Sequence, residues 1–341
     1  MHSFVAAQTN NIVSILDAIG LADIVALMLS PPPLKNALYY PVTSSVVLAA
    51  VALTLMWWSG QPVDDVVMNS LVWEKWQLWR ALTATLLHVN FFHLAFNLYW
   101  IWTFGALVER EFGHARCASI FLLLAFGSML AEFAVLSGGV GLSGVGYGLW
   151  GMLWVLEKRD PRFTDAVDQK TSQMFIGWFF LCILLTVTGV MPVANVAHGV
   201  GAVMGILLGF AICGRRQVQR ESMAGLAIVL SLAILGSTVY WPLANFSEDA
   251  IEKVEEVGLV ALAKNEGPHA LKLLERAAHM RHAPARMWYN LGIAYRDNGR
   301  YQDAAAAFEH AAKMPDADEK MRAIGKDLEG RAAPAVTNAV Q

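Results

Sequence analysis

The feature that most constrains this chain is a series of seven apolar stretches, each 14 to 22 residues long, separated by polar or glycine-rich connections. A helix of about 20 apolar residues is long enough to cross the hydrocarbon core of a bilayer. The stretches cover residues 43–59, 91–107, 115–136, 143–156, 174–190, 194–213 and 223–243. Because unpaired backbone groups are costly in lipid, each stretch is expected to be helical. We therefore predict an all-α, polytopic membrane bundle with seven spans.

The composition agrees with a membrane protein that carries a soluble tail. Hydrophobic residues make up 56% of the 341 residues and charged residues 16%, and the charges become dense only after about Leu243. The formal net charge of -3 argues against a nucleic-acid partner. Cys117, Cys182 and Cys213 each fall within an apolar stretch, so they imply no disulfide framework.

Two further segments differ from the spans. The first is residues 1–42, whose apolar run at 12–29 is interrupted by Asp17 and Asp23 and is followed by proline-rich sequence. We predict an amphipathic helix lying in the membrane interface there, with an additional span as the alternative. The second is the tryptophan-rich connection 61–87, which is too polar to span and is typical of a loop at the interface.

Positive charge predicts the orientation of the spans. Lysine and arginine collect in alternate connections, and the connections between them carry no charge. The basic residues are Arg110, Arg116, Lys158, Arg159, Arg162, Lys170, Arg215, Arg216 and Arg220. Since basic connections stay in the cytoplasm, we expect a protein of a bacterial inner membrane whose C-terminal tail emerges on the outer side.

The tail contains a self-repeat with a period of 34 residues. Gly258, Ala270, Leu274, Glu275, Ala277, Ala278 and Met280 recur as Gly292, Ala304, Phe308, Glu309, Ala311, Ala312 and Met314. The second copy also carries a W-x2-L-G-x2-Y signature from Trp288 to Tyr295, which resembles tetratricopeptide repeats. We predict two helical repeats at 251–284 and 285–318, a capping helix at 319–329, and a protein partner that binds on the repeats.

These observations divide the chain into five parts. They are an interfacial segment at 1–42, a six-span core at 43–213, a cytoplasmic loop with the seventh span at 214–246, a repeat region at 247–330 and a disordered tail at 331–341. The polar residues that suggest chemistry all fall within the six-span core.

A glycine-rich turn, Gly141-Leu142-Ser143-Gly144, opens the fourth span. The N-terminus of a helix leaves backbone N–H groups unpaired and carries partial positive charge, which suits a developing oxyanion. A serine at that position is therefore a candidate nucleophile. The alternative is that the small residues form a packing face for a neighbouring helix.

A histidine in the sixth span favours the nucleophile. A serine hydroxyl needs a base within hydrogen-bond reach, usually a histidine. In the predicted orientation, His198 and Ser143 both lie in the outer part of the membrane. Gly201 and Gly205 share the helix face of His198, so this helix can pack closely against the span that begins at Ser143. The alternative is a core histidine with a purely structural hydrogen bond.

Two more polar residues occur one helical turn apart in the second span. His93 and Asn97 project from one face and can donate hydrogen bonds to an oxyanion. His88 lies five residues before His93, a spacing that places the two on different faces of a helix, so we predict that His88 orders the interface loop. This spacing, and the lack of cysteine or carboxylate ligands nearby, argue against a zinc site.

Taken together, these motifs resemble the rhomboid intramembrane serine proteases. The matching motifs are His88-x4-His93-x3-Asn97, Gly141-x-Ser143-Gly144, Ala197-His198-x2-Gly201-x3-Gly205, Trp79-Arg80, Glu109, Gly113 and Tyr147. They agree in order and spacing and cover about residues 43–213. The seventh span and the repeat region lie outside the resemblance.

The resemblance implies roles for individual residues. Ser143 and His198 would form a catalytic dyad without an acid, His93 and Asn97 would line the oxyanion hole, and Tyr147 would pack against His198. The residues that would pack the site are Tyr147, Gly141 and Gly144. The residues with structural roles would be Trp79, Arg80 and Glu109. No cofactor and no metal is implied.

The expected function is therefore that of an intramembrane serine endopeptidase that cuts a single-span membrane protein near its outer end. One alternative is an inactive rhomboid-like adaptor that presents membrane clients through its repeats. A transporter is a third interpretation, weakened by the absence of an acidic proton-relay residue deep in the later spans. Glu132, in the third span, has no predicted role beyond a buried hydrogen bond.

Overall fold

The structure, a computed structural model, describes residues 31–69, 72, 77–136, 138–280 and 282–326. The chain divides into two compact units, Met1–Thr238 and Val239–Gln341. The predicted interfacial helix at 12–29 and the predicted disordered tail at 331–341 lie outside the described residues.

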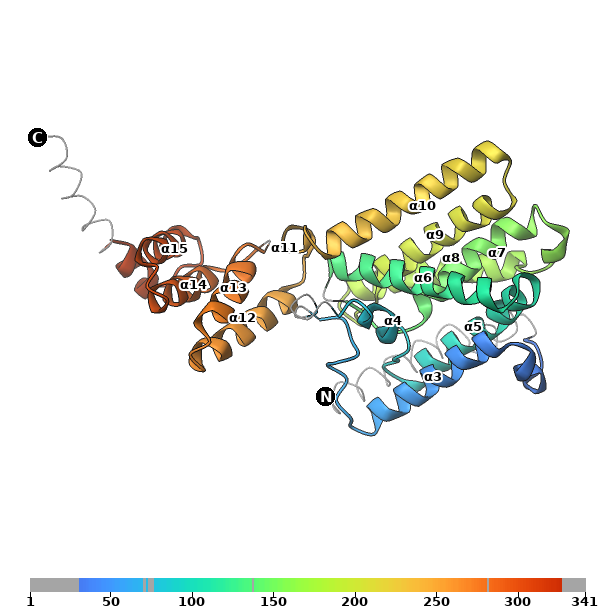
Figure 1. Ribbon diagram of the computed structural model, residues 1–341, viewed down its shortest axis with the longest axis horizontal. Helices are drawn as coiled ribbons and strands as arrows, with labels where there is room; N and C mark the ends of the chain where they lie inside the picture. Colours follow the sequence, from blue (N-terminus) through green and yellow to red (C-terminus); the bar gives the residue numbers. More distant parts are fainter. Residues whose placement is uncertain (1–30, 70–71, 73–76, 137, 281, 327–341) are drawn as a thin grey trace, which may run out of the picture. The chain divides into compact units, whose positions relative to one another are not determined.

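All the regular secondary structure in the described part of the first unit is helical (Figure 1). Its α-helices are α3 (Pro41–Trp58), α4 (Arg80–Ala84), α5 (Phe91–Phe112), α6 (His114–Val135), α7 (Ser143–Glu157), α8 (Gln169–Val187), α9 (Asn195–Cys213) and α10 (Arg216–Ser237), with short 3-10 helices η1 (Leu34–Tyr39) and η2 (Pro161–Phe163). Six of them, α3, α5, α6, α8, α9 and α10, are long and apolar enough to cross a membrane. The predicted all-α polytopic bundle is thus confirmed, and the chain is an integral membrane protein.

The fourth predicted span forms a shorter helix than the other six. Helix α7 has 15 residues, of which 12 are buried by the surrounding helices. Because its side chains contact protein more than lipid, α7 does not need to match the full thickness of the bilayer. The interface loop 61–87 contains only the five-residue helix α4 among its described residues.

Local sequence determines where the helices begin and end. The side chain of Asn90 caps α5 by accepting a hydrogen bond from the backbone N–H of His93 at 2.9 Å. Helix α5 ends at Gly113, whose φ of +79° suits glycine, and α6 begins at the next residue. Helix α10 begins at Arg216, well before the apolar stretch 223–243, because its polar first turns are also helical.

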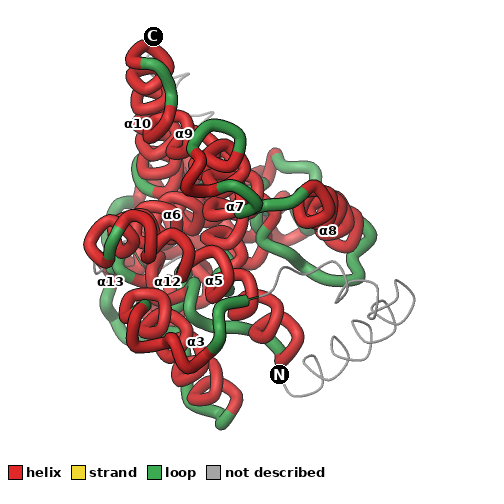
Figure 2. Tube along the Cα trace, turned by 90° about the vertical axis from the view of Figure 1, so that its right-hand side faces the viewer, coloured by secondary structure: helices red, strands yellow, loops and turns green. Residues whose placement is uncertain are grey.

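Helix α7 lies among α5, α6, α8 and α9, and its contact with α9 is the most extensive between any two described helices. Helix α6 packs against both α9 and α10, and Figure 2 shows α6, α7 and α9 side by side. An aromatic cluster fills the space between α5, α7 and α8; its members are Trp100, Phe104, Tyr147, Trp150 and Phe175. Helix α8 makes little further contact and stands apart in Figure 2.

Glycines allow the close approach of α7 and α9, as their spacing predicts. A Cβ atom added to Gly201 would collide with the backbone carbonyl of Gly144, and one added to Gly205 would collide with that of Gly148. These pairs are one helical turn apart on both helices, so the two backbones touch along a continuous line.

The second unit consists of helical pairs. Its helices are α11 (Trp241–Ala244), α12 (Glu248–Ala263), α13 (Gly267–Ala278), α14 (Ala285–Asp297) and α15 (Tyr301–Lys313), and residues 319–326 are also helical. The same contact occurs in both pairs: a Cβ on Gly258 would meet Leu274 at 2.9 Å, and one on Gly292 would meet Phe308 at 2.6 Å. The period of 34 residues is thus a structural period as well.

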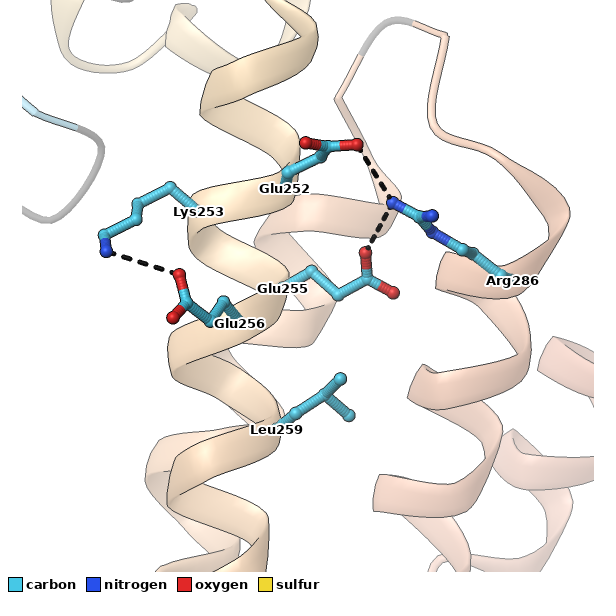
Figure 3. A pocket seen from close by; sticks show the side chains of 6 residues that line it. All are labelled: Glu252, Lys253, Glu255, Glu256, Leu259 and Arg286. Carbon is cyan, nitrogen blue, oxygen red and sulfur yellow. Dashed lines mark hydrogen bonds and ion pairs between the residues drawn. The ribbon is translucent and has the colours of Figure 1, made fainter. Parts of the chain in front are cut away.

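The unit begins before the predicted repeat region. Trp241, near the start of the unit, is fully buried, and the guanidinium of Arg276, on α13, lies 4.5 Å from the centre of the Trp241 ring. The two pairs are joined by Arg286 of α14, which contacts Glu252 at 3.4 Å and Glu255 at 3.1 Å on α12 (Figure 3). These three side chains line an open pocket on the surface of the unit, and Leu259 lines it as well.

Candidate active site

Ser143 and His198 meet at the interface of α7 and α9. Ser143 is the first residue of α7 and His198 the fourth residue of α9, and His198 Nε2 lies 2.7 Å from Ser143 Oγ. His198 is buried and Ser143 is half-buried. The other ring nitrogen, His198 Nδ1, has no hydrogen-bond partner among the described residues. The distance between Nε2 and Oγ is that of a hydrogen bond between the imidazole and the hydroxyl.

Tyr147 holds the plane of the His198 imidazole. It lies one helical turn after Ser143, and its ring stacks on that of His198 with centroids 4.7 Å apart and an interplanar angle of 27°. The Tyr147 hydroxyl donates a hydrogen bond to the carbonyl oxygen of Phe175 on α8 at 3.0 Å. The ring that supports His198 is thus itself fixed at its far end.

His88 lies beneath the turn that precedes Ser143. Its Nδ1 is 3.2 Å from the Leu86 carbonyl oxygen, and its Nε2 is 3.4 Å from the backbone nitrogen of Leu142. One tautomer satisfies both contacts, because Nδ1–H then donates to Leu86 and Nε2 accepts from Leu142. His88 thereby connects the interface loop to the residue that immediately precedes Ser143.

The expectation that His88 and His93 point to different faces was wrong. The prediction assumed one continuous helix, but α5 begins at Phe91 and His88 lies in the loop before it. The chain turns at the cap residue Asn90, and the two rings meet edge to face with centroids 4.9 Å apart.

His93 lies directly against the glycine-rich turn. A Cβ on Gly141 would come within 2.6 Å of His93 Nε2, and Gly141 has a φ of +112°, so glycine is required there for two independent reasons. His93 Nδ1 is buried without a partner among the described residues. Asn97 is buried one turn further along, and its Nδ2 donates to the His93 carbonyl oxygen at 2.9 Å.

Three other predicted residues, Gly144, Arg80 and Trp79, differ in their surroundings. Gly144 faces α6, where a Cβ would meet the Ser128 hydroxyl at 2.6 Å. The buried Arg80 donates to the Asp64 carbonyl at 2.6 Å and pairs with Asp65 at 3.0 Å, while Trp79 is half exposed.

Across the described ranges, no three His, Cys, Asp or Glu side chains gather as a metal site would require.

Three polar residues around the site escaped the sequence analysis. The Thr54 hydroxyl lies 3.4 Å from His88 Nδ1. The Thr186 hydroxyl accepts hydrogen bonds from Asn195 Nδ2 at 2.8 Å and from the backbone N–H of Val193 at 3.2 Å, which holds the loop before α9. The only signal in the sequence was a polar residue within or beside an apolar stretch.

Fold and site together define a polytopic helical membrane protein with a serine–histidine pair between two tightly packed helices. The family model of the rhomboid domain matches residues 75–215, which include Ser143 and His198. This match supports the rhomboid family for that part of the chain. The second unit lies outside the match.

Individual relatives agree. The chain is 32% identical over 159 residues to the rhomboid protease GlpG of Serratia proteamaculans, which covers 46% of this chain and 54% of the relative. It is 33% identical over 177 residues to that of Pectobacterium atrosepticum and 31% identical over 187 residues to that of Salmonella typhi, covering 50% of this chain and 62% of each relative. The chain thus spans between half and two thirds of the length of these relatives.

Proposed function

We propose that this protein is an intramembrane serine endopeptidase that cleaves transmembrane segments of other membrane proteins. The observation that carries the proposal is the 2.7 Å contact between His198 Nε2 and Ser143 Oγ inside a bundle of membrane-spanning length. The similarity to proteins named rhomboid proteases supports it. An adaptor that only binds its clients would have no use for this contact.

In the first step, Ser143 Oγ attacks the carbonyl carbon of the scissile peptide bond. His198 Nε2 accepts the hydroxyl proton as the new C–O bond forms, and the imidazolium is steadied by the Tyr147 ring stacked on it. Collapse of the tetrahedral intermediate breaks the C–N bond, and the leaving amine takes the proton from Nε2. Water then attacks the carbonyl carbon of the acyl-enzyme, and His198 Nε2 accepts a proton from it. The proton passes to Ser143 Oγ as the ester C–O bond breaks.

The negative charge that develops on the substrate oxygen needs hydrogen-bond donors. Asn97 Nδ2 has two hydrogens, of which one is used by the His93 carbonyl oxygen, so the second is available. His93 lies against Gly141, two residues before the nucleophile. The backbone N–H of Ser143, at the first position of α7, adds a donor and the positive end of the helix dipole.

Substrate class and orientation follow from the position of the site in the membrane. Ser143 and His198 stand at the N-terminal ends of their helices, and the charge-free connections next to them are those that the distribution of basic residues places outside. We therefore propose cleavage of a single-span protein near its outer end, in a bacterial inner membrane with seven spans. The tetratricopeptide-like tail would emerge outside and bind a protein partner.

The experiment that tests the proposed chemistry is labelling with a fluorophosphonate, which reacts with activated serine hydroxyls. The purified full-length protein should form an adduct on Ser143, identified by mass spectrometry of its peptide. His198→Ala should abolish the labelling, because the base is lost. Labelling on a different serine, or equal labelling without His198, would refute the dyad.

A further inference from the structure

Glu132 is a carboxylate on α6 that the chemistry above does not use. It is 1% exposed, and its Oε2 accepts a hydrogen bond from the backbone N–H of Ala197 at 2.8 Å. Ala197 is the third residue of α9 and immediately precedes His198. A buried carboxylate in a membrane-spanning helix is costly, so its bonding to the backbone at the start of α9 calls for an explanation.

Helix α9 lacks a cap of its own. The first N–H groups of a helix have no partner within it, and the side chain of the N-cap residue usually supplies an acceptor. The N-cap of α9 is Ala194, which has no side-chain oxygen. Glu132 therefore provides from α6 the acceptor that α9 cannot provide for itself. A carboxylate suits this position because the N-terminus of a helix is electropositive.

The same stretch of α6 also contacts the other half of the site. A Cβ on Gly139, in the loop leading to Ser143, would meet Ala194 Cβ at 2.8 Å and Glu132 Cγ at 3.7 Å. One turn before Glu132, Ser128 packs against Gly144, the residue after Ser143. Helix α6 thus touches both the nucleophile turn and the start of the helix that carries the base.

We propose that Glu132 is a positioning residue, which caps α9 and thereby sets the distance between His198 Nε2 and Ser143 Oγ. Without this acceptor, the first turn of α9 would have an unpaired buried N–H next to His198, and the turn would loosen. The positioning role rests on the proposed peptidase function, whereas the cap itself can be tested independently of activity.

The chain offers a matched control. Glu109, near the end of α5, is 2% exposed and caps α3 in the same way, accepting from the backbone N–H groups of Val42 at 2.9 Å and Thr43 at 2.8 Å. It lies 16 residues after His93 on one helix, or about 24 Å along its axis. Glu109 and Glu132 therefore stabilise helices by the same interaction, but only the α9 cap lies next to a candidate catalytic residue.

The experiment compares Glu132→Ala, Glu132→Gln and Glu109→Ala in the full-length protein. Hydrogen exchange by mass spectrometry should accelerate in the first turn of α9 for Glu132→Ala and in the first turn of α3 for Glu109→Ala. With a single-span substrate, Glu132→Ala should lower kcat per folded molecule about tenfold to a hundredfold and leave KM nearly unchanged. Glu132→Gln keeps an acceptor oxygen and should restore most of kcat. Glu109→Ala should lower thermal stability but not kcat.

Each other outcome counts against the proposal. Unchanged exchange at the start of α9 in Glu132→Ala would overturn the cap, whether or not the wild type cleaves. Faster exchange with unaltered kcat, or an equal loss of kcat in Glu109→Ala, would overturn the positioning role. A wild-type protein that neither cleaves nor labels with fluorophosphonate would refute the proposed function and the positioning role with it, while the exchange data would still decide the cap.

Discussion

The contact between α7 and α9 leads to a prediction about Gly201. In Gly201→Ala, the added Cβ would lie 3.0 Å from the carbonyl carbon of Gly144 and would collide with its oxygen. Carbon atoms pack at about 3.5–4.0 Å, so the contact with the carbonyl carbon alone requires the helices to separate by at least roughly 0.5–1 Å. The obstacle is backbone, which cannot rotate away as a side chain could.

This separation acts directly on the dyad. Gly144 is the residue after Ser143, and Gly201 lies three residues after His198. The 2.7 Å contact between Oγ and Nε2 would therefore lengthen to about 3.2–3.7 Å, at or beyond the limit of a hydrogen bond. A misplacement of about 1 Å can lower a rate about a hundredfold. Overpacking costs about 1–3 kcal/mol, partly offset by the gain of roughly 1 kcal/mol for alanine over glycine in a helix. Activity should therefore fall much more than stability.

Gly199→Ala is the control on the same helix. The nearest atom to its added Cβ is Phe179 Cζ at 3.6 Å, an ordinary contact. The assay is the cleavage rate of a single-span substrate in detergent, normalised to folded protein from a thermal unfolding curve. Full activity in folded Gly201→Ala, or an equal loss in Gly199→Ala, would refute the argument that the distance between the backbones sets the geometry of the dyad.

Further predictions follow from the donors, the loop and the tail. Asn97→Ala should lower turnover about tenfold to a thousandfold, with fluorophosphonate labelling partly retained, since the dyad itself is untouched. His88→Ala should lower the melting temperature more than the rate per folded molecule, because His88 ties the backbone groups of Leu86 and Leu142 together; the reverse order would show a catalytic role. Trp241→Ala should destabilise the second unit by about 3–5 kcal/mol, seen as an earlier transition by proteolysis within 239–341, and an unchanged transition would contradict its burial. A cysteine placed in the tail should react with an impermeant reagent in intact spheroplasts; reaction only after membrane rupture would put the tail in the cytoplasm.

The spans and the candidate dyad were accessible from sequence for different reasons. Long apolar stretches have one stable solution in lipid, so the helices follow from composition and length. The contact between α7 and α9 followed from Gly201 and Gly205, because small residues at a spacing of four form a flat helix face. His198 and Ser143 could be paired because both stand at the start of spans that run in the same direction.

Other features depend on tertiary structure that no local pattern records. The contact between His88 and His93 requires the turn at Asn90, and a helical spacing rule applied across that turn gave the wrong answer. The start of α10 at Arg216 was missed because apolar length marks the lipid-facing part of a helix and not its polar first turns. The partner of Glu132 lies 65 residues away, so the sequence shows the cost of burying the carboxylate but not the group that compensates for it.

Cleavage by matched proteins in lipid vesicles tests the central claim most directly. The wild type, Ser143→Ala, His198→Ala and the double variant would each be reconstituted with a single-span test protein, and the products identified by mass. The wild type should cut within or at the outer edge of the transmembrane segment, and the three variants should be equally inactive although folded and inserted, because members of a dyad act as a unit. Substantial cleavage by folded Ser143→Ala would contradict the account.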